Sequence, residues 1–89
     1  MIRRDIKELI GIVMRVLGGA EVSEDEILNL EFEADGELMA ALNETYILLL
    51  EFVHDRDLRK ADRNLDQRER SALQGSLNKI IELCDKTVS

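Results

Sequence analysis

The stretch LMAALNETYILLLEFV, residues 38–53, decides the fold class of this chain. Its apolar residues recur every three or four positions, so Leu38, Leu42, Leu49 and Phe52 share one stripe of a helix. A second apolar stripe lies beside the first. The pattern continues into the charged residues that follow, and it predicts a central helix over residues 37–60.

The run ILLL at residues 47–50 makes the central helix apolar in every direction around its axis. Such a helix has to be covered on most sides, and an 89-residue chain offers few other helices to do this. We therefore predict a homodimer that packs this helix against its twin or against the last helix of the other subunit. The alternative is that the other helices of the same chain suffice. The candidate interface comprises Tyr46, Ile47, Leu48, Leu49, Leu50 and Val53.

Two helices are expected before the central one. Apolar residues at helical spacing predict a first helix over residues 2–17, and the glycines at 18–19 supply the left-handed turn that ends a helix. Ser23 followed by Glu26 forms a capping box, which predicts a short helix near residues 24–33. The second half of that segment also alternates apolar and polar residues as a short strand does, but we favour the helix.

A last helix is expected near the C-terminus, over residues 67–86. Residues 55–70 are highly charged, and we expect a turn around residues 63–65. Asp66 and Glu69 then form a capping pair for the final helix. The predicted architecture is a small all-α helical bundle of three main helices, 2–17, 37–60 and 67–86, with the short helix after the first.

Composition agrees with a single all-helical domain over residues 1–89. Apolar residues make up 45% and charged residues 35%, and the chain has no proline or tryptophan. No apolar stretch is long enough to cross a bilayer, so we expect no membrane partner. The basic N-terminus lacks the continuous apolar run of a signal peptide, and the single cysteine excludes an internal disulfide. We expect a cytoplasmic protein.

The charge distribution is strongly uneven. Residues 18–54 contain ten acidic residues and no lysine or arginine. We expect this segment to repel nucleic acid and interpret it as a solvated surface that aids solubility; the alternative is that it attracts a basic partner. The candidate acidic partner patch comprises Glu21, Glu24, Asp25, Glu26, Glu31, Glu33, Asp35 and Glu37.

No motif for catalysis, a cofactor or a metal is found in the sequence. His54 and Cys84 are the only residues of their kinds, too few for a zinc site, and a thiol–imidazole pair would require a third, orienting group. The alternation of Asp62, Asn64 and Asp66 resembles the start of a calcium loop, but the required glycine and the bidentate glutamate are replaced by Gln67 and Leu73. We expect no enzyme activity, no cofactor and no metal.

The stretch Ala-Asp-Gly-Glu-Leu, residues 34–38, resembles the segment of acyl carrier proteins that precedes a helix in small acidic helical domains. That family carries its prosthetic group on a serine immediately after the aspartate. Gly36 occupies this position here, so the function of that family is excluded.

Two functional hypotheses follow. The first is a non-enzymatic protein–protein interaction or scaffold module that acts as a homodimer through the apolar run. The alternative is an acidic inhibitor or antitoxin-like protein that neutralises a basic partner through the patch at residues 21–37.

Overall fold

The computed structural model describes residues 4–88, and the regular structure in this range is entirely helical. The all-α prediction is confirmed. The helices are α1 (Arg4–Leu17), α2 (Glu24–Leu28), α3 (Gly36–His54), α4 (Arg56–Ala61) and α5 (Arg63–Val88). Residue 2, at which the predicted first helix begins, lies outside the described residues.

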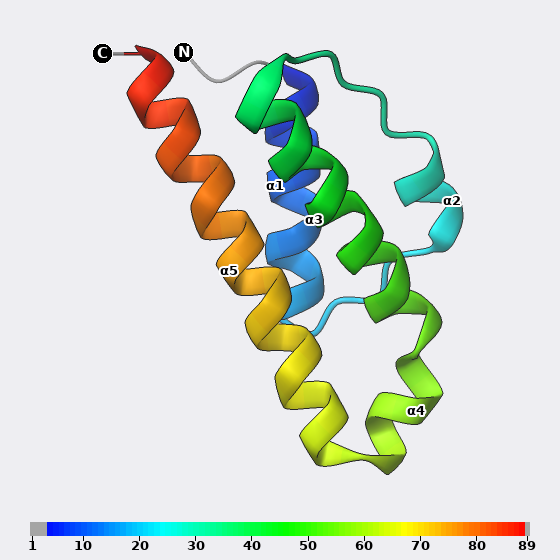
Figure 1. Cartoon of the computed structure of the whole chain (residues 1–89). Helices are drawn as coiled ribbons and strands as arrows, with labels where there is room; N and C mark the ends of the chain where they lie inside the picture. Colours follow the sequence, from blue (N-terminus) through cyan, green and yellow to red (C-terminus); the bar gives the residue numbers. More distant parts are fainter. Residues whose placement is uncertain (1–3, 89) are drawn as a thin grey trace.

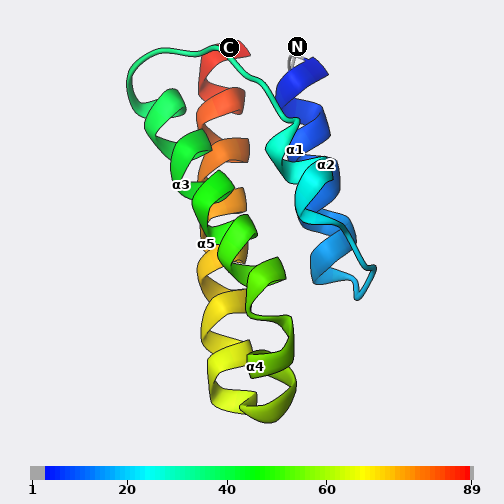
Figure 2. The ribbon, with the colours of Figure 1, turned by 90° about the vertical axis from the view of Figure 1, so that its right-hand side faces the viewer.

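The helices form a narrow bundle of 43 × 24 × 20 Å. The long helices α3 and α5 run side by side in opposite directions, and the short α4 connects them at one end (Figure 1). Helix α1 packs against both of them, and α2 lies beside α1 and α3 on the far side from α5 (Figure 2). This arrangement leaves one long side of α3 uncovered by any helix.

The core lies where α1, α3 and α5 meet. Fully buried side chains include Leu9 and Val13 from α1, Leu49 from α3, and Leu73 and Ile80 from α5. Burying each such leucine or isoleucine contributes about 1.5–3 kcal/mol relative to leaving it exposed. The apolar stripes predicted from the sequence therefore do point to a common core.

One polar contact is built into this core. Thr45 is fully buried in α3, and its hydroxyl donates to the carbonyl of Ala41 at 2.8 Å. The same hydroxyl is hydrogen-bonded to Ser76 of α5. Because buried hydroxyl groups need partners, this pair fixes the register of α3 on α5.

The short helix α2 starts as predicted but ends earlier. Ser23 and Glu26 form the capping box, with the Glu26 amide donating to Ser23 Oγ at 3.3 Å. Helix α2 ends at Leu28, not near residue 33. Residues 30–34 are non-helical, and the alternate residues Leu30, Phe32 and Ala34 pack against the core. The two-residue alternation in the sequence was thus the correct signal here, although this segment pairs with no strand.

The central helix is interrupted earlier than predicted. Residues 37–60 form two helices, because α3 ends at His54 and α4 starts at Arg56. Asp55 joins them with φ −86° and ψ 16°, outside the helical range of ψ. The two helices then diverge, as Figure 1 shows at the lower end of the bundle.

The last helix begins at Arg63, four residues before the predicted start at residue 67. Asp62 explains the difference, because its Oδ1 accepts hydrogen bonds from the amides of Asn64 and Leu65 at 3.0 and 3.2 Å and so caps the helix. The predicted turn at residues 63–65 is therefore wrong. The predicted capping role of Asp66 and Glu69 is also wrong, since both lie inside α5.

Candidate functional site

The predicted interface residues differ in how much apolar surface they expose. Leu49 is fully buried in the core of its own chain and is not available to a partner. Ile47 is 55% exposed, although it lies in the middle of α3. The remaining four, Tyr46, Leu48, Leu50 and Val53, are half-buried. The surplus apolar surface expected from the sequence is thus centred on Ile47.

The eight residues of the acidic patch fall into two groups. Three of them form exposed ion pairs with other elements: Glu21 with Arg56, Glu24 with His54 at 3.3 Å, and Glu26 with Arg15 at 3.7 Å. Exposed pairs of this kind contribute little to stability, typically 0–1 kcal/mol. The other five are also exposed: Asp25, Glu31, Glu33, Asp35 and Glu37.

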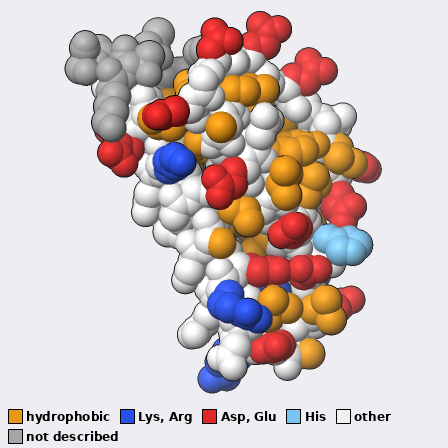
Figure 3. All heavy atoms as spheres, viewed as in Figure 1, with side chains coloured by type: hydrophobic (Ala, Val, Ile, Leu, Met, Phe, Trp, Pro, Cys, Tyr) orange, Lys and Arg blue, Asp and Glu red, His pale blue; other side chains and the backbone are white. Residues whose placement is uncertain are grey.

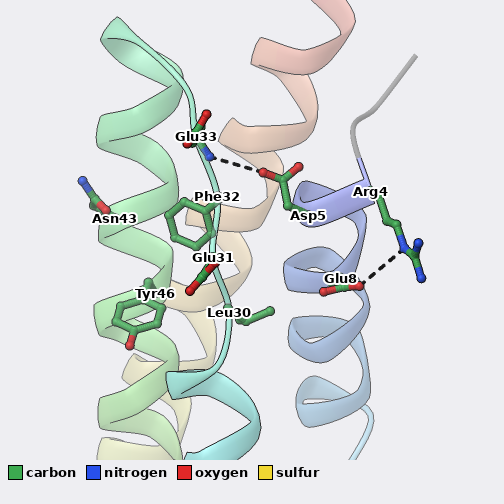
Figure 4. Close-up of a pocket in the computed structure, with 9 residues that line it drawn as sticks. All are labelled: Arg4, Asp5, Glu8, Leu30, Glu31, Phe32, Glu33, Asn43 and Tyr46. Carbon is green, nitrogen blue, oxygen red and sulfur yellow. Dashed lines mark hydrogen bonds and ion pairs between the residues drawn. The ribbon is translucent and has the colours of Figure 1, made fainter.

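An open hollow of about 940 Å³ lies between the start of α1, the extended segment and the middle of α3 (Figure 4). It brings part of the acidic patch together with part of the predicted interface. Nine residues of the described part of the chain line it: Arg4, Asp5, Glu8, Leu30, Glu31, Phe32, Glu33, Asn43 and Tyr46.

Two aromatic rings form one wall of the hollow. Phe32 and Tyr46 pack edge to face, with ring centroids 6.2 Å apart and an interplanar angle of 73°. Figure 4 places both rings on the α3 side of the extended segment, with Leu30 on the α1 side. The pair joins the extended segment to α3 and presents apolar surface next to carboxylates.

The charge around the hollow is predominantly negative. Asp5, Glu8, Glu31 and Glu33 contribute carboxylates, and the one cation among the lining residues that the structure describes, Arg4, lies 3.8 Å from Glu8. Asp5 also holds the extended segment in place by accepting a hydrogen bond from the Glu33 amide at 3.3 Å. Negative charge beside aromatic faces is an environment suited to an ammonium or guanidinium group.

The sequence predicted Glu31, Glu33 and Tyr46 as members of the acidic patch or the interface, but not the other residues that line the hollow. Asp5, Glu8 and Asn43 carry no local signal, because only the packing of α1 and α3 around the extended segment brings them together. Phe32 had a usable signal, since it lies in the alternating run that indicated extended chain.

A second polar cluster lies where α4 folds back on α5. The Arg59 guanidinium stacks 3.5 Å from the centroid of the Phe52 ring, and its Nη1 donates to Asp66 at 2.8 Å. Arg70 Nε donates to the other oxygen of Asp66 at 2.9 Å. The hydrogen bond from Arg59 is the main cause that lowers the pKa of Asp66.

Glu69 completes this cluster and has the most perturbed carboxyl group. Its side chain is only 17% exposed, and its Oε2 is buried without a hydrogen bond from any described residue. Burial, reinforced by hydrogen bonding and repulsion from Asp55, raises the pKa of Glu69 to about 7. Arg59, with Nε 3.6 Å from Oε2, opposes this shift only in part.

His54 and Cys84 lie on different helices, α3 and α5, and differ in exposure. His54 is exposed and bonded to Glu24, whereas Cys84 is buried and burial raises the pKa of its thiol. Among residues 4–88, no group of histidine, cysteine and acidic residues is arranged to hold a metal ion. In the same range, no helix is both long and apolar enough to span a membrane.

Comparison of the chain with protein families, with curated proteins and with solved structures found no match.

Proposed function

We propose that this chain is a non-enzymatic interaction module that binds a basic segment of a partner protein in the hollow between α1, the extended segment and α3. The observation that carries the proposal is the aromatic pair of Phe32 and Tyr46 beside the carboxylates of Glu31 and Glu33. A lysine or arginine side chain of the partner would lie against the rings and pair with the carboxylates.

The apolar surface next to the hollow supports a partner that is apolar as well as basic. Ile47 follows Tyr46 on α3 and is 55% exposed, so an apolar residue beside the partner's cation would cover it. Figure 3 shows apolar side chains gathered over α3 and towards α2, with carboxylates around them. Most of the lysine and arginine side chains visible in that view lie near the turn between α4 and α5.

Binding of a labelled amphipathic peptide of lysine and leucine, measured by fluorescence anisotropy, tests the proposal. Its twin with glutamate in place of lysine is the control for charge. Glu31→Gln should weaken peptide binding about threefold or more, whereas Asp57→Asn, at an exposed position of α4, should leave peptide binding almost unchanged. Equal effects of the two substitutions would show that the peptide responds only to net charge, and would contradict the proposal.

A matched pair of substitutions tests the apolar part of the site. Ile47→Ser should weaken peptide binding, whereas Met14→Ser, which removes a 61% exposed apolar side chain from α1, should not. Neither side chain is buried, so both variants should fold.

The homodimer through α3 is the second candidate, and the exposure of Ile47 favours it too. Symmetric self-association through this face would bring the carboxylates of Glu31 and Glu33 towards those of the second copy, which disfavours it relative to a basic partner. Light scattering over a concentration series decides between them. A dimer that Ile47→Ser dissociates would support self-association.

A further inference from the structure

A second cavity, of about 430 Å³, lies on another part of the molecule, between the loop after α1 and the cluster around α4. Its apolar surface comes from Val16, Val22, Phe52 and Val53. Four cationic side chains also line it: Arg56, Arg59, Lys60 and Arg70. This is a local reversal of charge in a chain whose net charge is −7.

Two of these arginines are held rigidly and retain unused donors. Arg59 donates one hydrogen bond from Nη1 to Asp66 at 2.8 Å and one from Nε to the carbonyl of Phe52 at 2.9 Å. Arg70 donates one hydrogen bond from Nε to Asp66 at 2.9 Å and one from Nη1 to the carbonyl of Leu17 at 3.0 Å. No described residue accepts a hydrogen bond from Nη2 of either arginine. Fixed guanidinium groups with spare donors lose little entropy when an anion binds.

The other two cations lie at the mouth of the cavity. Lys60 is exposed and forms no ion pair with the described residues. Arg56 is paired with Glu21, which also lines the cavity and whose side chain is 72% exposed. An external carboxylate would thus compete with Glu21 for Arg56, and Glu21 shows that a carboxylate fits at this place.

We infer that this cavity binds a small organic carboxylate with a short apolar chain, whose head group contacts the cations and whose chain lies against the apolar lining, in which Val53 is more exposed than Phe52 and the other two valines. The volume lies within the usual range for small-molecule sites, about 300–1,000 Å³. A singly charged head suits the site, because Glu21 and Asp66 already offset part of the positive charge. The inference does not depend on the proposed function, since it concerns different residues.

Titration of the ¹⁵N-labelled chain with hexanoate, followed by amide chemical shifts, tests the inference. We expect saturable shifts in residues 19–23 and at Val53 and Arg56. Hexanol, which lacks the charge, and acetate, which lacks the chain, should each bind about tenfold more weakly or worse. Equal binding of hexanol would show a merely apolar crevice, and shifts that stay linear up to about 20 mM hexanoate would show no site at all.

Two matched pairs of substitutions locate the site. Lys60→Gln should weaken hexanoate binding about threefold or more, whereas Lys79→Gln, at an exposed position of α5, should not weaken it. Glu21→Gln should tighten binding by a similar factor because it removes the internal competitor, whereas Glu37→Gln should not. If the members of each pair behave alike, binding reflects net charge, and the inference is overturned. All four side chains are exposed, so folding should be preserved.

Discussion

Replacing Glu69 by glutamine should stabilise the protein at neutral and alkaline pH. The carboxylate is largely buried, its Oε2 lacks a hydrogen bond from any described residue, and Asp55 repels it. Glutamine has nearly the same shape as protonated glutamate and carries no charge to desolvate. The substitution therefore keeps the packing of α5 and removes an unfavourable charge.

The pKa of Glu69 sets the size and the sign of the effect. Its folded-state pKa is about 7, raised from 4.5, so the folded chain retains a proton that the unfolded chain releases between these values. The stabilising contribution of this proton is complete below pH 4.5 and is lost as the pH rises towards 7. The full shift corresponds to a ceiling of about 3 kcal/mol. Solvent screening, together with the lost attraction to Arg59, reduces the expected gain to about 1–2 kcal/mol.

Urea denaturation followed by circular dichroism measures the difference. The free energy of unfolding of Glu69→Gln should exceed that of the unaltered protein by about 1–2 kcal/mol at pH 8 and by about zero at pH 4.5. Glu44→Gln, an exposed substitution on α3, is the control and should show no such pH dependence. A Glu69→Gln variant that is less stable than the unaltered protein at pH 8 would contradict this prediction, because it would show that the ion pair with Arg59 outweighs burial.

Three further predictions concern the core and the helices. Leu49→Ala should lower the free energy of unfolding by about 2–5 kcal/mol, whereas Ile47→Ala should lower it by less than about 0.5 kcal/mol. Urea denaturation measures both values, and similar losses for the two variants would show that α3 is wrongly oriented. Gly75 occupies an exposed helical position with open space around it, so Gly75→Ala should raise the free energy of unfolding by about 0.5–1 kcal/mol and with it the thermal midpoint. Gly36→Ala should lower the thermal midpoint, because φ is +61° at Gly36. Cys84 should react with a thiol reagent at pH 8 far more slowly in the folded chain than in urea, and equally fast labelling would argue against its burial.

Local patterns in the sequence predicted much of the fold. The three main helices and their buried faces follow from apolar spacing, and Ser23 with Glu26 marks the start of α2 because a capping box depends only on neighbouring residues. The break at Asp55 was not predicted, because the apolar pattern continues across it into α4. The start of α5 was misplaced because Asp62 and Asp66 are both plausible caps, and the pairing of Asp66 with Arg59 and Arg70 is a tertiary effect.

The candidate site was predictable only in part. Charge counting identified Glu31 and Glu33, but it did not separate them from Glu24, which pairs with His54 from a distant part of the chain. Apolar periodicity identified the run at residues 47–50, but which of its members is exposed depends on where α1 and α5 pack. Ile47 and Leu49 are two residues apart and have opposite environments, because the neighbouring helices cover only one side of α3.

The hollow beside α3 is the site proposed to bind the basic segment of a partner. Amide chemical shifts of the ¹⁵N-labelled chain, recorded during titration with the lysine–leucine peptide, test it most directly. We expect the largest shifts in residues 29–35 and 43–50, with little change in the second half of α5. Shifts spread evenly over exposed acidic residues, with none concentrated at Phe32 and Tyr46, would contradict it.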